Sequence, residues 1–256
     1  MNNKQLLLSI KNVTKTYSGT PTITALKGVN IDIYQGEILS LLGVNGAGKT
    51  TLSSIIATLH PATSGEILHN GVSIYKDIIS FRRIMGFCPQ KPNIDAMLTI
   101  KENLIFAGRY FNLSPETIEQ RSTELMEKFQ LTKYADAKGS MLSGGYKQRF
   151  LLARTLMHSP KIVILDEPTV ALDPHIRRNL WDIIKQLKND GVTVLLTTHY
   201  IEEAEVLSDR VCILDQGVIK LIDTPDNLKK DYSKENLEDV FIKLMQESDK
   251  DKEHGL

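Results

Sequence analysis

Eight consecutive residues, 43–50, have the types and spacing of a phosphate-binding loop, reading Gly-Val-Asn-Gly-Ala-Gly-Lys-Thr. In such a loop the glycines let backbone N–H groups curve around phosphate oxygens, while the lysine reaches the outer phosphates and the threonine hydroxyl ligates Mg²⁺. A glycine turn of this pattern arises by chance in roughly one per cent of chains of ordinary glycine content. The expected contacts with a nucleotide come from Gly43, Asn45, Gly46, Ala47, Gly48, Lys49, Thr50 and Thr51.

A second candidate is a pair of adjacent carboxylates, Asp166 and Glu167, that follows the apolar run 162–165. Successive side chains at a strand end point in different directions, so only one of the two can face a metal ion. We expect Asp166 to hold Mg²⁺ and Glu167 to orient and deprotonate the attacking water. Alone, such a pair is more often a helix cap or a solvated turn, but the phosphate-binding loop upstream favours the functional interpretation.

The third candidate, Ser143-Gly144-Gly145, opens a predicted helix that runs to about residue 157. Unpaired backbone N–H groups at a helix start attract anions, so these residues predict a second anion site. Taken alone, a serine-capped helix after a flexible turn is the more common explanation.

An α/β core must position these residues. Residues 37–42 form a compact apolar run before the loop, and residues 49–59 follow with helical spacing until Pro61 stops the helix. Further apolar runs at 85–88, 162–165, 192–197 and 211–214 suit a mostly parallel sheet buried on both faces. Residues 6–13 and 29–34, with a turn at Gly19 and Pro21, predict a small N-terminal antiparallel sheet.

The stretch between Gln90 and Gly144 is predicted to be helical, with helices at 99–110 and 115–129. We expect one domain over residues 1–223 that contains an inserted helical subdomain at about 91–156. Residues 224–256 are expected to form a helical tail with a turn and N-cap at Thr224, an amphipathic segment at 237–245 and a frayed end.

Composition excludes several classes of protein. The 31 Lys and Arg balance the 31 Asp and Glu, so there is no overall basic field and we expect no nucleic-acid partner. Two cysteines, Cys88 and Cys212, are too few for a disulfide framework, and no secretory segment is found at the start, which favours the cytoplasm. All apolar runs fall short of the roughly 20 residues that a membrane-spanning helix needs.

The order of the motifs is more specific than any one of them. The phosphate-binding loop, Gln90, the Ser-Gly-Gly signature, the acidic strand, Asp173 and His199 follow one another as in the ATP-binding subunits of ABC transporters. The chain resembles that family from residue 6 to about 223. The resemblance implies a P-loop NTPase that binds ATP and Mg²⁺ and hydrolyses ATP, with Lys49, Glu167 and His199 as catalytic residues.

The resemblance also implies further roles. Tyr17 would stack on adenine, Gln90 would contact Mg²⁺ and the water, Asp173 would communicate across a dimer, and His199 would contact the γ-phosphate. Simpler explanations exist for each: a strand-end tyrosine, a loop glutamine, a helix cap and a structural histidine. No role is expected for His60, His69, His158, His175 and His254.

Members of this family pair head to tail, so the resemblance implies a homodimer or a pairing with an equivalent second ATP-binding subunit. Ser143, Gly144 and Gly145 of one protomer would complete the γ-phosphate site begun by Lys49 of the other. Separate transmembrane permease subunits are the implied partners, which places the chain on the cytoplasmic face of the inner or plasma membrane. Residues 198–205 and the tail are similar to subunits of bacterial ABC-2 type exporters, so export is implied.

A soluble ABC-type ATPase without a transport role is the alternative. Ribosome-associated members of this class carry two ATP-binding domains in one chain, and repair proteins carry long coiled coils, whereas this chain has one P-loop and no sustained heptads. An iron–sulfur assembly ATPase stays open. The chain departs from the family at Tyr146, where the signature most often has Gln, and we expect this to alter packing more than phosphate binding.

Overall fold

The computed structural model describes residues 5–253, and the side chains of residues 5–247. The strands are β1 (Leu6–Tyr17), β2 (Ile23–Tyr34), β3 (Ile38–Leu42), β4 (Ser64–His69), β5 (Val72–Ser73), β6 (Met85–Cys88), β7 (Ile162–Asp166), β8 (Thr193–Thr198), β9 (Arg210–Asp215) and β10 (Val218–Asp223). The helices are α1 (Lys49–Ile56), α2 (Ile78–Ile84), α3 (Ile100–Tyr110), α4 (Pro115–Lys128), α5 (Gly144–Thr155), α6 (Pro174–Asn189), α7 (Ile201–Leu207), α8 (Pro225–Asp231) and α9 (Leu237–Glu253), with short 3₁₀ turns at Thr132–Tyr134 and Gly139–Met141.

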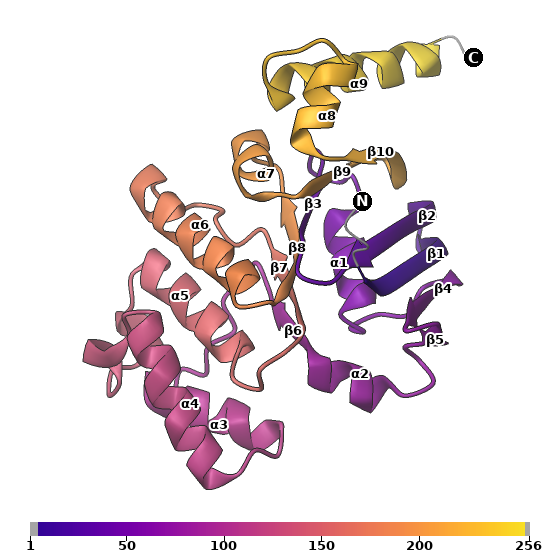
Figure 1. Ribbon diagram of the computed structural model, residues 1–256. Helices are drawn as coiled ribbons and strands as arrows, with labels where there is room; N and C mark the ends of the chain where they lie inside the picture. Colours follow the sequence, from indigo (N-terminus) through magenta and orange to yellow (C-terminus); the bar gives the residue numbers. More distant parts are fainter. Residues whose placement is uncertain (1–4, 254–256) are drawn as a thin grey trace.

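Within the described residues the strands form two sheets (Figure 1). The N-terminal sheet has the order β2-β1-β4-β5 and is antiparallel. The larger sheet has the order β10-β9-β3-β8-β7-β6, in which every neighbouring pair is parallel except β10 with β9. The expected α/β class, with a mostly parallel sheet and an N-terminal antiparallel sheet, is therefore confirmed.

The parallel arrangement brings three chain segments to one edge of the large sheet. Leu42 at the end of β3 pairs with Thr198, and Asp166 at the end of β7 pairs with Thr197. The loop after β3, the carboxylates after β7 and His199 after β8 therefore leave the sheet side by side. This is the edge at which open α/β sheets bind ligands.

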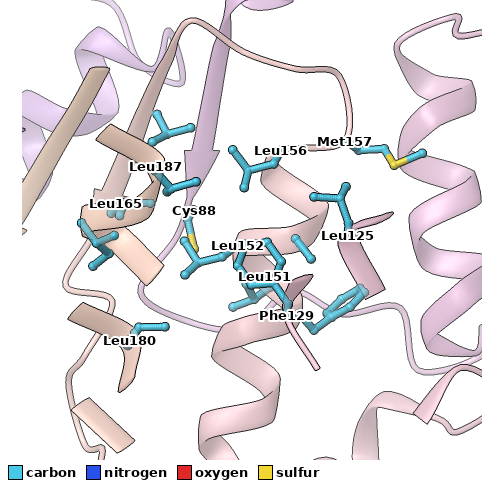
Figure 2. Close-up of a cluster of buried hydrophobic side chains, with 14 of the residues drawn as sticks. Cys88, Leu125, Phe129, Leu151, Leu152, Leu156, Met157, Leu165, Leu180 and Leu187 are labelled. Atoms are coloured by element: carbon cyan, nitrogen blue, oxygen red, sulfur yellow. The ribbon is translucent and has the colours of Figure 1, made fainter. Parts of the chain in front are cut away.

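The large sheet is buried on both faces, as the continuous apolar runs predict. Along β7, Val163 and Leu165 belong to an apolar cluster shared with α3, α4, α5 and α6, whereas Ile162 and Ile164 belong to a second cluster with α1 and the N-terminal sheet. Figure 2 shows part of the first cluster, where Leu125, Phe129 and Leu165 meet the apolar face of α5. Opposite faces are occupied because successive side chains alternate across a strand.

Several elements differ from the sequence-based expectation. Helix α1 ends at Ile56 rather than near Leu59, and Thr58 takes a left-handed backbone conformation with φ 60° well before Pro61. Strands β1 and β2 extend towards the Gly19–Pro21 turn through polar residues, and Thr16 and Thr24 pair across the hairpin with hydroxyl oxygens 3.3 Å apart. Elements β4, β5, α2 and β10 were not predicted because they are short and contain few buried residues.

The tail begins as expected, because the Thr224 hydroxyl accepts a hydrogen bond from the Asn227 backbone N–H and caps α8. Helix α9 begins at Leu237 but runs beyond the predicted residue 245. Leu237, Val240 and Leu244 pack in a cluster with residues of α7, α8 and β9. None of the helices in the described part of the chain combines the length and the apolar character needed to span a membrane.

Candidate nucleotide-binding site

A cavity of about 450 Å³ lies at the carboxyl edge of the large sheet. It is lined by predicted site residues from four separate parts of the chain, together with two neighbours that were not predicted, Ala25 and Val170. The predicted residues are Asn45, Gly46, Gly48, Lys49, Thr50, Thr51, Gln90, Glu167 and His199. The fold therefore assembles the phosphate-binding loop, the lone glutamine, the second carboxylate and the histidine around one space.

The Lys49 side chain folds back onto the start of the phosphate-binding loop. Its Nζ atom donates hydrogen bonds to the carbonyl oxygens of Gly43 at 2.8 Å and Val44 at 3.2 Å, and lies 3.4 Å from Glu167 Oε1. Burial lowers the pKa of Lys49, and the nearby charges of Glu167 and Asp166 oppose this effect. The ammonium can exchange these carbonyl oxygens for the oxygens of a phosphate, which accept stronger, charge-assisted hydrogen bonds.

Gly48 shows why the loop needs glycine at this position. It precedes α1 with φ 109°, and a Cβ atom placed there would lie 2.8 Å from the Ala25 carbonyl oxygen. Other residues rarely adopt this conformation. The loop can therefore present its N–H groups only with glycine before Lys49.

Asp166 ends β7 and is 3% exposed. Its Oδ1 atom accepts hydrogen bonds from the hydroxyls of Thr197 at 2.6 Å and Thr50 at 3.3 Å. Burial raises the pKa of Asp166, and the two hydroxyl donors oppose this effect. Asp166 and Thr50 thus bring two oxygen ligands together beside the phosphate-binding loop, the donor type that Mg²⁺ prefers when phosphates and waters complete its shell.

Glu167 lies at the centre of the site. Its backbone is left-handed at φ 48°, and its N–H donates to the carbonyl oxygen of Thr197 at 3.1 Å and to the Thr197 hydroxyl at 3.0 Å. Its Oε2 atom accepts a hydrogen bond from Gln90 Nε2 at 3.1 Å and lies 3.3 Å from His199 Nδ1. The turn separates the two carboxylates as expected: Asp166 faces Thr50, and Glu167 faces Gln90 and His199.

Sequence reasoning missed Thr197, whose hydroxyl donates to Asp166 and accepts from the Glu167 backbone. Thr197 is fully buried at the end of β8. The only signal in the sequence is a hydroxyl residue at the end of an apolar run, two residues before His199, and this signal becomes informative only when β7 and β8 are known to be neighbours.

Gly43, Ala47 and Asp166 adjoin the lining residues but do not line the cavity themselves. A second group of predicted residues also does not line it: Tyr17, Ser143, Gly144, Gly145 and Asp173. Ser143 and Asp173 occupy the N-cap positions of α5 and α6, but neither side chain makes a capping hydrogen bond. The hydrogen bond expected if these residues were simple side-chain caps is therefore absent at both positions. Tyr17 is 41% exposed at the end of β1, with Lys15 Nζ 5.1 Å from its ring centre.

Tyr146, the departure from the family signature, packs against Tyr134 with ring centres 4.7 Å apart. The expectation that this departure alters packing more than phosphate binding stays a prediction. Of the histidines without an expected role, His158 stacks on Phe111 and His69 bonds to the Leu7 carbonyl oxygen. His60, His69, His158 and His175 do not line the nucleotide cavity, and His254 lies outside the described residues.

Comparison with known proteins identifies relatives of this chain. The sequence profile of the ABC transporter family matches residues 26–170, more than half of the chain, and a profile described as an AAA domain, putative AbiEii toxin, matches residues 140–203. The chain is 42% identical over 210 residues to the Nod factor export ATP-binding protein I of Rhizobium meliloti (strain 1021), which covers 82% of this chain and 62% of that protein. It is 40% identical over 222 residues to the linearmycin resistance ATP-binding protein LnrL of Bacillus subtilis (strain 168), which covers 87% of this chain and 70% of the relative. The chain thus spans less than two thirds of the Nod factor export protein.

Solved structures agree with these relatives. An ATP-binding subunit of an ABC transporter superposes with a TM-score of 0.83 at 28% identity, covering 93% of this chain and 99% of that one. A dimeric ATP-binding cassette in a post-hydrolysis state, bound to ADP and Pi, superposes with a TM-score of 0.78 at 33% identity, covering 85% of this chain and 98% of that one. On its sequence and its fold, the chain belongs to the family of ABC transporter ATP-binding proteins.

Proposed function

We propose that this chain binds ATP and hydrolyses it to ADP and phosphate. The observation that carries the proposal is the convergence of Lys49, Gln90 and His199 on the carboxylate of Glu167. Glu167 lines the cavity with a carboxylate that can accept a proton from an attacking water, and Gln90 orients that carboxylate. Lys49 and His199 stabilise the charge that develops on the transferred phosphate.

Mg²⁺ fits the proposed site through Thr50 and Asp166, with Gln90 as a further oxygen ligand. When bound, the ion neutralises phosphate charge. Asp166 and Thr50 are already held together by a hydrogen bond, so little movement is required for both to face one cation. Tyr17 at the exposed end of β1 is the proposed stacking partner for adenine, because aromatic faces suit flat bases.

We propose that the complete site forms between two protomers arranged head to tail. Two observations support this arrangement: Ser143 and Asp173 lie at helix starts without side-chain capping bonds, and a structural relative is a dimer. In this arrangement Ser143, Gly144 and Gly145 of one protomer contact the phosphate held by Lys49 of the other, and Asp173 lies at the interface.

Mixing two inactive variants tests the composite site. We expect Lys49→Ala and Ser143→Arg each to abolish ATPase activity alone, because each damages every site of its own dimer. A mixed dimer has one site with both changes and one site with neither. An equal mixture should therefore recover about a quarter of the intact sites of wild type, if protomers pair at random. Release of phosphate measures this recovery, and a mixture as inactive as its components would contradict the composite site.

We further propose that the energy of hydrolysis drives export through separate membrane-spanning subunits, at whose cytoplasmic face the chain is peripherally bound. The name of one relative, the Nod factor export ATP-binding protein I, supports this direction. The proposed domain organisation is an ATP-binding domain at 1–223 with a helical subdomain at about 91–156 and a tail at 224–256.

A groove of about 500 Å³ is the proposed docking surface for the membrane subunit. It lies where the ends of α1 and α3 approach α2 and β6. Ile79 and Tyr110 at its rim are 66% and 74% exposed. The groove is lined by Ala57, Leu59, Ile79, Arg82, Arg83, Met85, Phe87, Tyr110, Phe111 and Asn112.

Introducing negative charge into this groove tests whether the membrane subunit docks there. We expect the double variant Ile79→Asp, Tyr110→Asp to reduce recovery of a polytopic membrane protein with the tagged chain by about tenfold or more, because anchor residues each contribute about 2 kcal/mol. The measurement is mass spectrometry of partners from detergent-solubilised host membranes with ATP present. Met141→Asp, which changes a residue 70% exposed outside the groove, is the control.

The same purification tests the alternative, a soluble ABC-type ATPase such as one for iron–sulfur assembly. Recovery of soluble partners alone by the wild-type chain would keep the ATPase and overturn the transport proposal. Loss of the membrane protein from Met141→Asp as well would show that the effect of the double variant is not specific to the groove.

A further inference from the structure

A fully buried carboxylate, Glu203, lies outside the proposed catalytic site. It belongs to α7, and it does not line the nucleotide cavity. Its Oε1 atom accepts two hydrogen bonds of 2.8 Å, one from the Thr169 hydroxyl and one from the Trp181 indole N–H. Burial raises the pKa of Glu203, and these donors with Thr198 oppose that shift. A buried carboxylate is costly unless such donors hold it, so its position is closely defined.

The two donors come from segments that carry proposed site residues. Thr169 lies two residues after Glu167. Trp181 lies in α6, which starts directly after Asp173, and Glu203 lies in α7, which starts two residues after His199. One carboxylate oxygen therefore joins the loop of Glu167, the helix that follows Asp173 and the helix that follows His199.

A second contact, which uses no hydrogen bond to Glu203, joins α6 to the residue before α7. The Arg177 guanidinium of α6 stacks on the Tyr200 ring at 4.1 Å from its centre. Tyr200 in turn lies beside His199, with ring centres 4.3 Å apart, and its backbone N–H donates to the Thr198 hydroxyl at 3.0 Å. The turn that carries His199 is thus held to α6 at two places.

We infer that Glu203 is a positioning residue that holds the His199 turn against the segment from Glu167 to Asp173, so that these parts keep their mutual geometry during hydrolysis. The inference rests on the proposed ATPase function. Glu203 acts through His199 and Glu167, which lie 3.3 Å apart across the cavity. Displacing catalytic groups by even about 1 Å can cost about 10²-fold in rate.

Three variants test this role. Glu203→Met removes the acceptor at similar volume, Glu203→Gln keeps an oxygen that can accept both hydrogen bonds, and Glu202→Met changes an exposed neighbour on the same helix. We expect Glu203→Met to lower kcat for ATP about tenfold or more, with an unchanged KM. We expect Glu203→Gln and Glu202→Met to retain most of the wild-type kcat. A wild-type kcat in Glu203→Met, or a fall in Glu203→Gln equal to that in Glu203→Met, would overturn the inference.

Should Glu203→Met fail to fold, Thr169→Val gives a second test, because it removes one donor and keeps the side-chain shape. A severalfold lower kcat with an unchanged circular dichroism spectrum is expected, and an unchanged kcat would overturn the inference.

Fluorescence supplies a readout that does not depend on turnover. Trp181 is the sole tryptophan of the sequence, so its emission reports directly on the hydrogen bond to Glu203. We expect this emission to be the same with and without MgATP in wild type, because the contact keeps its geometry, and to shift with MgATP in Thr169→Val, where the link to the Glu167 loop is cut. A shift in a wild-type chain that hydrolyses ATP would overturn the inference alone, whereas a folded wild-type chain without ATPase activity would overturn the proposed function.

Discussion

Replacing Glu167 with glutamine is expected to lower ATP turnover by about 10²–10⁴-fold, the usual contribution of a general base, while ATP still binds. Glutamine keeps the shape of the side chain and an oxygen that Gln90 can still contact, but it cannot accept a proton from water. It also removes the negative charge that faces Lys49 at 3.4 Å, so ATP affinity should not fall. Phosphate release measures turnover, and equilibrium binding of labelled ATP measures affinity.

Glu116→Gln is the matched control, because Glu116 is exposed at the start of α4, far along the chain from the site. Its turnover should equal that of wild type. Retention of more than about a tenth of the wild-type rate in Glu167→Gln would contradict the assignment of Glu167 as the base, given the usual size of that contribution.

Replacing Lys49 with alanine is the second change with a large expected effect, and it should act on binding rather than on chemistry alone. The Lys49 ammonium is buried among the Gly43 and Val44 carbonyl oxygens, where no other described cation lines the cavity. Removing a buried charge that pairs with a phosphate costs about 2–5 kcal/mol, so ATP affinity should fall by about 30-fold or more. Isothermal titration with MgATP measures the change.

Lys76→Ala, at an exposed position after β5, controls for the loss of one positive charge from the chain. Its ATP affinity should match that of wild type. Equal ATP affinities for Lys49→Ala and Lys76→Ala would contradict the phosphate-binding role of the loop at 43–50.

Local patterns predicted the elements whose sequence alone determines them. Strand β6 begins at Met85 and ends at Cys88 as expected, and Pro89 directly after Cys88 closes its apolar run. Helix α4 begins at Pro115 as expected, because Ser114 caps it and proline suits the first helical turn. The predicted end of α1 was wrong. The helix ends at Ile56, shortly before Thr58 takes a left-handed backbone conformation, and no residue type near position 57 predicts that conformation.

The site shows the same division between local and tertiary information. The loop at 43–50 lies within one strand-turn-helix unit, so its sequence pattern alone predicted the strand, the turn and the helix start. The hydrogen bond from Gln90 to Glu167 joins residues 77 positions apart, and only the pairing of β6 with β7 brings them together. Thr197 was missed for the same reason, since its hydroxyl meets Asp166 through the pairing of β7 with β8. The roles of Ser143 and Asp173 depend on a second protomer and stay predictions.

The apolar cluster in Figure 2 bears on how force would pass through the molecule. Leu125 of α4 and Phe129 directly after it share one continuous core with Leu152 of α5 and Leu165 of β7, the strand that ends at Asp166. A hinge between α4 and the sheet would have to open this core, and close-packed interiors resist such opening. A push on the helical side of the groove would therefore move α4, α5 and Ser143 together as one rigid body, without bending the chain between the groove and Ser143.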